Sequence, residues 1–502
     1  MQCETKSPTQ HKPPSTSPEM AAPRATKRRA GGYRATVARA RGAEVHLAQT
    51  PESRTLLHGV DCGAPVVIDP APYIAAAREP GWGAYLDAFL SRNRVALNAL
   101  NLEPRIVSGR DGVRLELQPG LRAGAIPLRS AVSGQVAGGV VISPRFGWPG
   151  VGQVLSATGW GSGPEFLSLP LVPGSGREVP PWVLAGPVLR RLKDLLEHLR
   201  PGYIEREEVR SHPRGQIQWH SYLRRQMPAG RWHQLPCRFS ELDTDSRLRQ
   251  VVRWTLERLH TDLGSVGGSD AIATSLIGQI VLLLEHVLDV PARRPLRGEL
   301  EQDLGGGPMA SLALREGLRA IGWIVDERGL GGGRTSDGLA WTLPLEQLWE
   351  RFVESQVRDE AARTGGRVRV GRLGETVIPL AWNDSSHKAL GHLIPDFVVH
   401  RHDGIEIVDA KYKSHFADLD ANRWSALAEE TQSSMRADLH QVLAYAATAG
   451  SADKIRATLI YPVRRRLYDD LQQYNRAETR AIIPVGYRQI TLRMKAVAFG
   501  SA

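Results

Sequence analysis

The middle of the chain carries apolar residues at the three- and four-residue spacing of a buried helix face. The first run comprises Val188, Leu189, Leu192, Leu195, Leu196 and Leu199. The second run comprises Val251, Val252, Trp254, Leu256 and Leu259. This pattern predicts a mainly helical region over residues 181–335.

The most apolar stretch of the chain, Ile272–Val290, lies in the same region. A membrane span needs about 20 predominantly apolar residues, whereas this stretch contains Glu285 and His286. We therefore expect a helix buried in the protein core.

Before residue 181 the pattern changes to short Val, Ile and Leu runs separated by turn residues, which predicts a β-rich domain over residues 43–180. Within it, the segment Ser143–Leu155 places glycines and prolines around Phe146 and Trp148. We expect a loop that presents both rings to a protein partner. In the alternative, both rings pack inward and the glycines only turn the chain.

Two glycine clusters, Gly305–Gly307 and Gly329–Gly333, follow the helical pattern. The second resembles a phosphate-binding loop but lacks the Gly-Lys-Ser/Thr ending that places a lysine on the phosphates. We interpret it as a linker and find no other nucleotide-binding loop in the sequence.

The positive charge of the chain is unevenly distributed. The net charge is +11, and residues 1–42, with nine basic and two acidic residues, supply +7 of it. We expect this segment to be a disordered tail that either contacts phosphates or only improves solubility. The other 460 residues are mildly basic.

The N-terminus lacks the apolar core of a signal peptide, so we expect a cytoplasmic protein. Cysteines occur only at positions 3, 62 and 237, a spacing that favours neither a disulfide framework nor a cysteine zinc site.

Two apolar runs near the C-terminus, Leu393–His400 and Ile405–Tyr412, flank the turn pair Asp403-Gly404. Apolar runs on both sides of Asp-Gly predict a β-hairpin. The richness of the runs in Val, Ile and Phe indicates strands that are covered on both faces.

The hairpin places three charged residues together. With Asp403 and Gly404 at the centre of the turn, Asp396 faces Lys411, and Asp409 lies on the same face because side chains alternate with period two. A register shifted by two residues pairs Asp396 with Asp409 and keeps this result. A shift of one residue would separate them.

Burying a charged side chain in an apolar hairpin is costly unless the charge is paired or, for a carboxylate, bound to a cation. Oxygen ligands of this kind suit Mg²⁺ or Mn²⁺, which also bind substrate phosphates. The alternative is an Asp–Lys salt bridge on a solvated face. The covered strands favour a metal site in which Asp396 and Asp409 are ligands and Lys411 assists attack by water.

These residues also resemble a known signature. Pro395-Asp396 followed by Asp409-Ala410-Lys411 resembles the PD-(D/E)xK nucleases. The segment ADLHQVLAYA carries Gln441 and Tyr445 on one helix face and resembles the Gln-x-x-x-Tyr motif of their RecB-like branch. That resemblance implies that both residues orient the lysine or the DNA backbone. The alternative is a polar helix surface.

The helix expected at Pro344–Val357 resembles the one that contributes a metal-binding glutamate in this superfamily. The match points to Glu350, with Trp349 in place of a phenylalanine; the alternative is a solvated acidic face. The resemblance further implies the Ala410 carbonyl as a metal ligand.

The order of these motifs resembles the McrC family, the nuclease subunits of McrBC modification-dependent restriction systems. Looser similarity extends upstream, through Ser143–Leu155, Pro213–Trp219 and Cys237–Leu259. The resemblance implies a DNA endonuclease subunit within a hetero-oligomer, with an AAA+ GTPase supplied in trans and docked by the N-terminal β-rich domain.

We therefore expect a multidomain protein with a basic tail, a β-rich N-terminal domain, an α-helical middle region and an α/β PD-(D/E)xK nuclease domain over residues 336–502. Two alternatives remain open: a self-sufficient nuclease of the same fold that acts in repair or on RNA, and an adaptor that mainly stimulates a partner NTPase.

Overall fold

A computed structural model describes residues 55–69, 74, 82–109, 112–160, 163–175, 179–199, 202–243, 246–266, 270–302, 304, 311–326, 337–380, 391–449, 454–485 and 488–500. The basic tail and the glycine clusters at 305–307 and 329–333 lie outside these residues. Within them, no helix is long and apolar enough to cross a membrane.

Strands dominate the N-terminal part, as the sequence predicts. A five-stranded sheet has the order β1-β6-β5-β11-β7, in which β1 and β6 run parallel. These strands are β1 (Thr55–Val60), β5 (Arg122–Arg129), β6 (Val136–Ser143), β7 (Glu165–Phe166) and β11 (Trp341–Pro344). A smaller sheet contains β2 (Val66–Ile68), β3 (Leu102–Gly109) and β4 (Gly112–Pro119), and α1 (Leu86–Ala99) packs on β5.

The glycine-rich segment after β6 differs from the predicted exposed loop. It forms helix α2 (Trp148–Ala157), and both aromatic rings pack inward. The ring centroid of Phe146 lies 5.2 Å from that of Phe499, and Trp148 lies 5.9 Å from Trp341. A Cβ atom at Gly152 would lie 2.8 Å from the Trp182 ring and 2.2 Å from the end of the Ile272 side chain, so both would have to shift. The alternative of inward packing is therefore correct, and partner binding through these rings remains only a prediction.

The helical middle region is built mainly from five helices among the described residues, of which α3, α5 and α6 cover the three apolar runs of the sequence. They are α3 (Pro181–His198), α5 (Arg247–Val266), α6 (Ala271–Glu285), α7 (Arg297–Gln302) and α8 (Leu312–Val325). The apolar face of α3 is buried, with Val188 and Leu192 fully inaccessible to solvent. Asp270 caps α6 by accepting backbone hydrogen bonds from Ile272 and Ala273.

The expectation that the Ile272–Val290 stretch is a buried core helix is wrong for one of its faces. Ile272, Leu276 and Ile280 are buried, whereas Leu282 is 61% exposed. The bundle covers one side of α6, so a sequence that is apolar all round does not ensure burial all round.

A three-stranded antiparallel sheet interrupts the predicted helical region. It comprises β8 (Gly202–Arg210), β9 (Gln216–Ile217) and β10 (Leu235–Asp243), and its tip carries the short helices α4 (Trp219–Ser221) and η3 (Tyr222–Gln226). We call residues 202–243 the arm. Cross-strand ion pairs such as Arg238–Glu207 support it, and Trp219 and Trp232 at the tip are 57% and 60% exposed.

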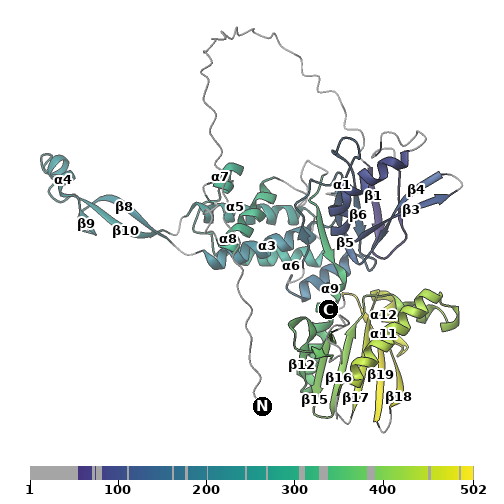
Figure 1. Ribbon diagram of the computed structural model, residues 1–502. Helices are drawn as coiled ribbons and strands as arrows, with labels where there is room; N and C mark the ends of the chain where they lie inside the picture. The colour runs from purple at the N-terminus through teal and green to yellow at the C-terminus, as the bar shows by residue number, and fades with distance from the viewer. Residues whose placement is uncertain are drawn as a thin grey trace, which may run out of the picture. The chain divides into compact units, whose positions relative to one another are not determined.

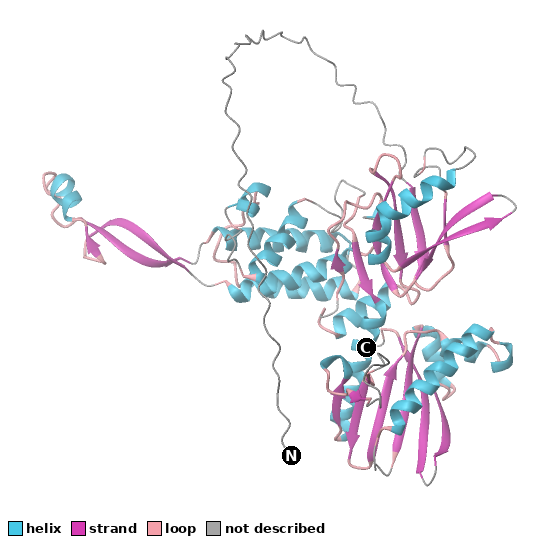
Figure 2. Ribbon diagram, viewed as in Figure 1, coloured by secondary structure: helices cyan, strands magenta, loops and turns pink. Residues whose placement is uncertain are grey.

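The C-terminal part is a mixed α/β arrangement around a six-stranded sheet of order β12-β15-β16-β17-β19-β18 (Figures 1 and 2). The strands are β12 (Arg367–Val370), β15 (Phe397–Arg401), β16 (Gly404–Ala410), β17 (Ile455–Val463), β18 (Glu478–Val485) and β19 (Arg488–Ala498). The helices are α9 (Leu345–Thr364), α10 (His415–Ala421), α11 (Glu429–Ala447) and α12 (Arg465–Gln473). A separate pair joins β13 (Ile378–Pro379) to β14 (His392–Leu393).

The β15–β16 hairpin forms in the second of the two registers that the sequence allows. Phe397 pairs with Val408 and Arg401 with Gly404, so His402 and Asp403 make the turn. The register centred on Asp403-Gly404 is therefore wrong by two residues. Gly404 lies in the strand, where a Cβ atom would be 2.1 Å from the Lys454 carbonyl oxygen.

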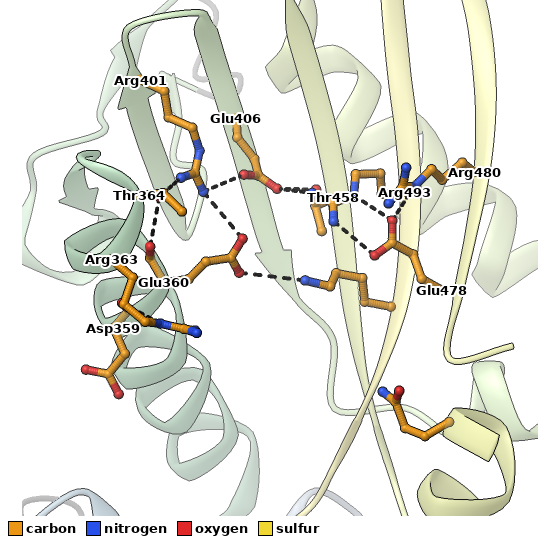
Figure 3. A network of polar contacts seen from close by, with 12 residues as sticks. Asp359, Glu360, Arg363, Thr364, Arg401, Glu406, Thr458, Glu478, Arg480 and Arg493 are labelled. Carbon is orange, nitrogen blue, oxygen red and sulfur yellow. Dashed lines mark hydrogen bonds and ion pairs between the residues drawn. The ribbon is translucent and has the colours of Figure 1, made fainter. Parts of the chain in front are cut away.

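A buried ion-pair network crosses this sheet (Figure 3). Glu406 on β16 accepts hydrogen bonds from Thr458, from Arg493 at 2.9 Å and from Arg401 at 3.1 Å. Arg493 also binds Glu478 through two nitrogen atoms. Because the members come from adjacent strands, the network fixes the sheet from β15 to β18.

Candidate active site

The C-terminal end of β16 supplies the centre of the candidate site. Asp409 is 1% exposed, and its Oδ2 atom lies 2.7 Å from Lys411 Nζ. Apart from this ion pair, Oδ2 has no hydrogen-bond partner among the described residues. A buried carboxylate oxygen with unused acceptor capacity is suited to a cation.

Asp396 lies immediately before β15, and the β15–β16 register, continued by one residue beyond the Phe397–Val408 pair, places it opposite Asp409. Its Oδ2 atom accepts a 2.7 Å hydrogen bond from the Ala410 backbone N–H. Burial raises the pKa of Asp396 to about 8, and the negative charge of Asp409 adds to the effect. Two carboxylates held this close to one another favour a bound cation.

Helix α11 completes the arrangement. Lys411 Nζ donates to Gln441 Oε1 at 2.8 Å, and Gln441 Nε2 donates to the Tyr445 hydroxyl at 2.7 Å. The four-residue spacing of Gln441 and Tyr445 places both on one face of α11. The structure thus brings together Asp396, Asp409, Lys411, Gln441 and Tyr445.

The carboxylates keep Lys411 in its charged form. Burial by itself would lower the pKa of Lys411, but the charges of Asp409 and Asp438 outweigh burial and raise it above the ordinary value. In the metal-free site, Lys411 is therefore a proton-bearing cation and a hydrogen-bond donor.

Glu350 projects from α9 and is half-buried. Burial raises its pKa, and its negative charge also contributes to the raised pKa of Asp396. Among the described residues, however, no group of three or more His, Cys, Asp or Glu side chains is gathered as a metal site. The structure thus leaves Glu350 and the Ala410 carbonyl as predicted ligands only.

The donor set still fits magnesium, because Mg²⁺ is commonly bound by one or two carboxylates and keeps several waters for substrate phosphates to replace. Asp396 and Asp409 provide two such carboxylates, with a free acceptor position on Asp409. Thiolate and imidazole ligands, which suit zinc, are absent from this set.

One supporting cluster was not predicted as part of the site. Lys413 Nζ donates to Asp438 at 2.7 Å and to Ser434 at 3.0 Å, and the Tyr461 hydroxyl lies 3.3 Å from the second oxygen of Asp438. Asp438 is 3% exposed. Its place one turn before Gln441 was the available signal, because that spacing puts both residues on the same face of α11.

The C-terminal part therefore defines an α/β protein with a carboxylate–lysine cluster at the end of a sheet strand. Residues 188–462, more than half of the chain, match the family model described as "McrBC 5-methylcytosine restriction system component". The chain belongs to this family, as the motif resemblance indicates.

Two solved structures from Thermococcus gammatolerans are similar to the chain. One is a half-complex of McrB AAA+ hexamers with bound McrC, at 12% identity and a TM-score of 0.38, covering 89% of this chain and 96% of that chain. The other is the McrBC complex, at 11% identity and a TM-score of 0.26, covering 63% and 90%. No curated protein matches. The family assignment rests on the family model.

Proposed function

We propose that the chain is the metal-dependent DNA endonuclease subunit of a McrBC-type restriction system. The observation that carries this proposal is the partly buried Asp396–Asp409 pair beside Lys411, which Gln441 holds in place. A site of this kind suits phosphodiester hydrolysis in general, and membership of the restriction-system family supports DNA restriction as its particular role.

In this proposal Asp396 and Asp409 hold Mg²⁺ or Mn²⁺. The bound metal supplies a Lewis acid and lowers the pKa of a coordinated water. The charged Lys411 ammonium stabilises the negative charge that develops on the phosphate. Because Gln441 Nε2 is engaged by Tyr445, its Oε1 atom faces the lysine and restricts where Nζ can lie.

We further propose that an AAA+ GTPase acts in trans and that the chain is one part of a hetero-oligomer. The arm offers a docking surface, because its tip exposes Trp219, Leu223 and Trp232. Exposed aromatic residues are enriched at protein interfaces, where a few of them supply most of the binding energy.

Cleavage of modified and unmodified duplex DNA by the purified chain, with Mg²⁺ and with or without the partner and GTP, tests these proposals. We expect strong cleavage of modified DNA only with the partner and GTP. Efficient cleavage by the chain alone would favour a self-sufficient nuclease. Stimulated GTP hydrolysis without any cleavage would favour an adaptor.

A further inference from the structure

The residue after Lys411 is held by a side chain from the N-terminal sheet. Arg145 follows strand β6, and its Nη2 atom donates a 2.7 Å hydrogen bond to the carbonyl oxygen of Tyr412. The Arg145 guanidinium also lies 4.4 Å from the centroid of the Tyr412 ring. A single side chain thus contacts both the backbone and the ring of Tyr412.

Asp61 orients Arg145. It is 1% exposed, accepts a 2.5 Å hydrogen bond from the Arg145 backbone N–H and lies 3.3 Å from Arg145 Nε. Burial raises the pKa of the Asp61 carboxyl, whereas the charge of Arg145 acts to lower it. Asp61 therefore contacts both the backbone and the guanidinium of Arg145 and restricts where the guanidinium can lie.

Two further side chains support the contact between Arg145 and Tyr412. Arg464, at the start of α12, donates a 3.0 Å hydrogen bond to the Arg145 carbonyl oxygen. Phe146 packs edge-on against Tyr412 at 5.5 Å and stacks on Phe499. The aromatic segment after β6 thus makes an internal contact next to the candidate site.

The backbone at Lys411–Lys413 has limited freedom. Lys411 N donates to the Ile460 carbonyl at 2.9 Å, and Lys413 N donates to the Lys411 carbonyl at 2.9 Å. Strand β16 ends at Ala410, and the bond from Lys411 to Ile460 is the last described backbone hydrogen bond from this segment to β17. The Arg145–Tyr412 bond holds the chain where the sheet no longer does.

We propose that Arg145 is a positioning residue that acts through Tyr412 to keep Lys411 directed at Asp409 and Gln441. This inference rests on the proposed nuclease function. Its consequence is that strands β1 and β6, through Asp61 and Arg145, set the geometry of the catalytic lysine. A displacement of about 1 Å at a reacting group can cost about 100-fold in rate.

The test compares Arg145→Ala with Arg190→Ala in the full-length chain. Arg190 is a matched control, because its Nη1 atom donates a 3.0 Å hydrogen bond to the Trp160 carbonyl, away from the candidate site. We expect Arg145→Ala to lower the single-turnover cleavage rate about tenfold or more, with KM for DNA and Mn²⁺ affinity changed less than about threefold. Arg190→Ala should keep the wild-type rate.

Added guanidinium, well below denaturing concentrations, should partly restore the rate of Arg145→Ala by occupying the space beside Asp61 and the Tyr412 carbonyl. Tetramethylammonium, which donates no hydrogen bonds, should not. Equal loss of rate in both variants, or a loss entirely in KM, would overturn the positioning role.

Amide hydrogen exchange gives a readout that does not depend on nuclease activity. In the metal-free protein, a peptide covering residues 404–414 should exchange about tenfold faster in Arg145→Ala and unchanged in Arg190→Ala. Unchanged exchange in Arg145→Ala overturns the inference. If exchange responds as expected but the wild-type chain cleaves no DNA with its partner and GTP, the contact stands and the nuclease proposal fails.

Discussion

At the scale of single residues, the carboxylates and the lysine of the candidate site are suited to different tasks. Asp396 and Asp409 repel each other in a partly buried setting, and this repulsion contributes to the raised pKa of Asp396. Lys411 gains from the same carboxylates and remains charged. In the proposed function the two acids hold a metal cation, and Lys411, which donates to Gln441 Oε1, supplies positive charge to the substrate phosphate.

Replacing Asp409 with alanine should abolish divalent-dependent cleavage while the chain stays folded and still binds its partner. The substitution removes a metal ligand, and with it the Lewis acid and its bound water. Cleavage assays with Mg²⁺ and with Mn²⁺ measure this. Asp469→Ala is the control, since Asp469 is 55% exposed in an ion pair on α12. Wild-type cleavage by the Asp409→Ala protein would refute the metal assignment.

Replacing Lys411 with alanine should lower the cleavage rate by roughly 100-fold or more and leave Mn²⁺ affinity nearly unchanged, because the lysine contributes charge to the transition state without binding the metal. Calorimetry with Mn²⁺ and single-turnover cleavage separate the two effects. Lys454→Ala, at a side chain that is 68% exposed, is the control. Lost Mn²⁺ affinity would instead indicate that the Lys411–Asp409 pair is structural.

At the scale of elements, the candidate site lies at the C-terminal end of β16, whereas the Glu406–Arg493–Glu478 network crosses the strands of the C-terminal sheet (Figure 3). The site contacts α11, whereas Glu360 on α9 joins the network through Arg401 and Lys495. The network stabilises the sheet without using the residues of the candidate site.

The network predicts a pH-dependent effect on stability. Burial by itself would raise the pKa of Glu478, but hydrogen bonds from Arg493 and Arg480 outweigh it and lower the pKa to about 2. A lowered carboxyl pKa contributes stability that is complete above the ordinary value of 4.5 and is lost as pH falls towards 2. Glu478→Gln should therefore lower the urea midpoint at pH 7 and have a smaller effect at pH 3.

Urea unfolding at both pH values, followed by circular dichroism, measures this difference. Glu301→Gln is the control, since the Glu301 side chain is 71% exposed in a surface ion pair. An effect of Glu478→Gln that is as large at pH 3 as at pH 7 would mean that the substitution acts through packing instead of charge.

At the scale of the whole molecule, segments distant in sequence build common structures. Strand β11, which begins at Trp341, pairs with β5 in the N-terminal sheet and leads directly into α9. Arg145 contacts Tyr412, 267 positions later in the chain. The N-terminal sheet is thus joined to the C-terminal part both through the chain and through side chains.

Partner binding should depend on the arm. Trp219→Ala and Trp232→Ala should each weaken association with the AAA+ partner by roughly 2 kcal/mol, because exposed aromatic anchors supply much of the energy of an interface. Calorimetry or sedimentation with the purified partner measures the affinity. Tyr474→Ala, an aromatic residue that is 63% exposed at the end of α12, should leave it unchanged. Equal effects at all three positions would exclude a specific role for the arm.

Deleting residues 1–42 should weaken DNA binding mainly at low salt, since this segment carries +7 of the net charge. Neutralising phosphates gives an affinity that falls steeply with salt concentration and does not depend on sequence. Binding curves over a range of NaCl concentrations measure the slope. A loss by the same factor at every concentration would contradict an electrostatic role for the N-terminal tail.

Local periodicity in the sequence was sufficient for several features of this protein. Because side chains in a strand alternate with period two, Asp396, Asp409 and Lys411 share one face of the hairpin in both of the registers considered. The four-residue spacing of Gln441 and Tyr445 places these two residues on one helix face. The helix at residues 181–198 followed from its apolar stripe. These features depend on neighbours within a few positions, so spacing alone specifies them.

Tertiary structure decided the rest. In the observed hairpin register Gly404 lies against the Lys454 carbonyl, and Phe146 packs on Tyr412 and Phe499, contacts that lie far apart in the sequence. The exposed face of α6 and the strands of the arm likewise depend on what the rest of the fold covers. Contacts across hundreds of residues leave no local period in a sequence, because they form only when separate elements pack together.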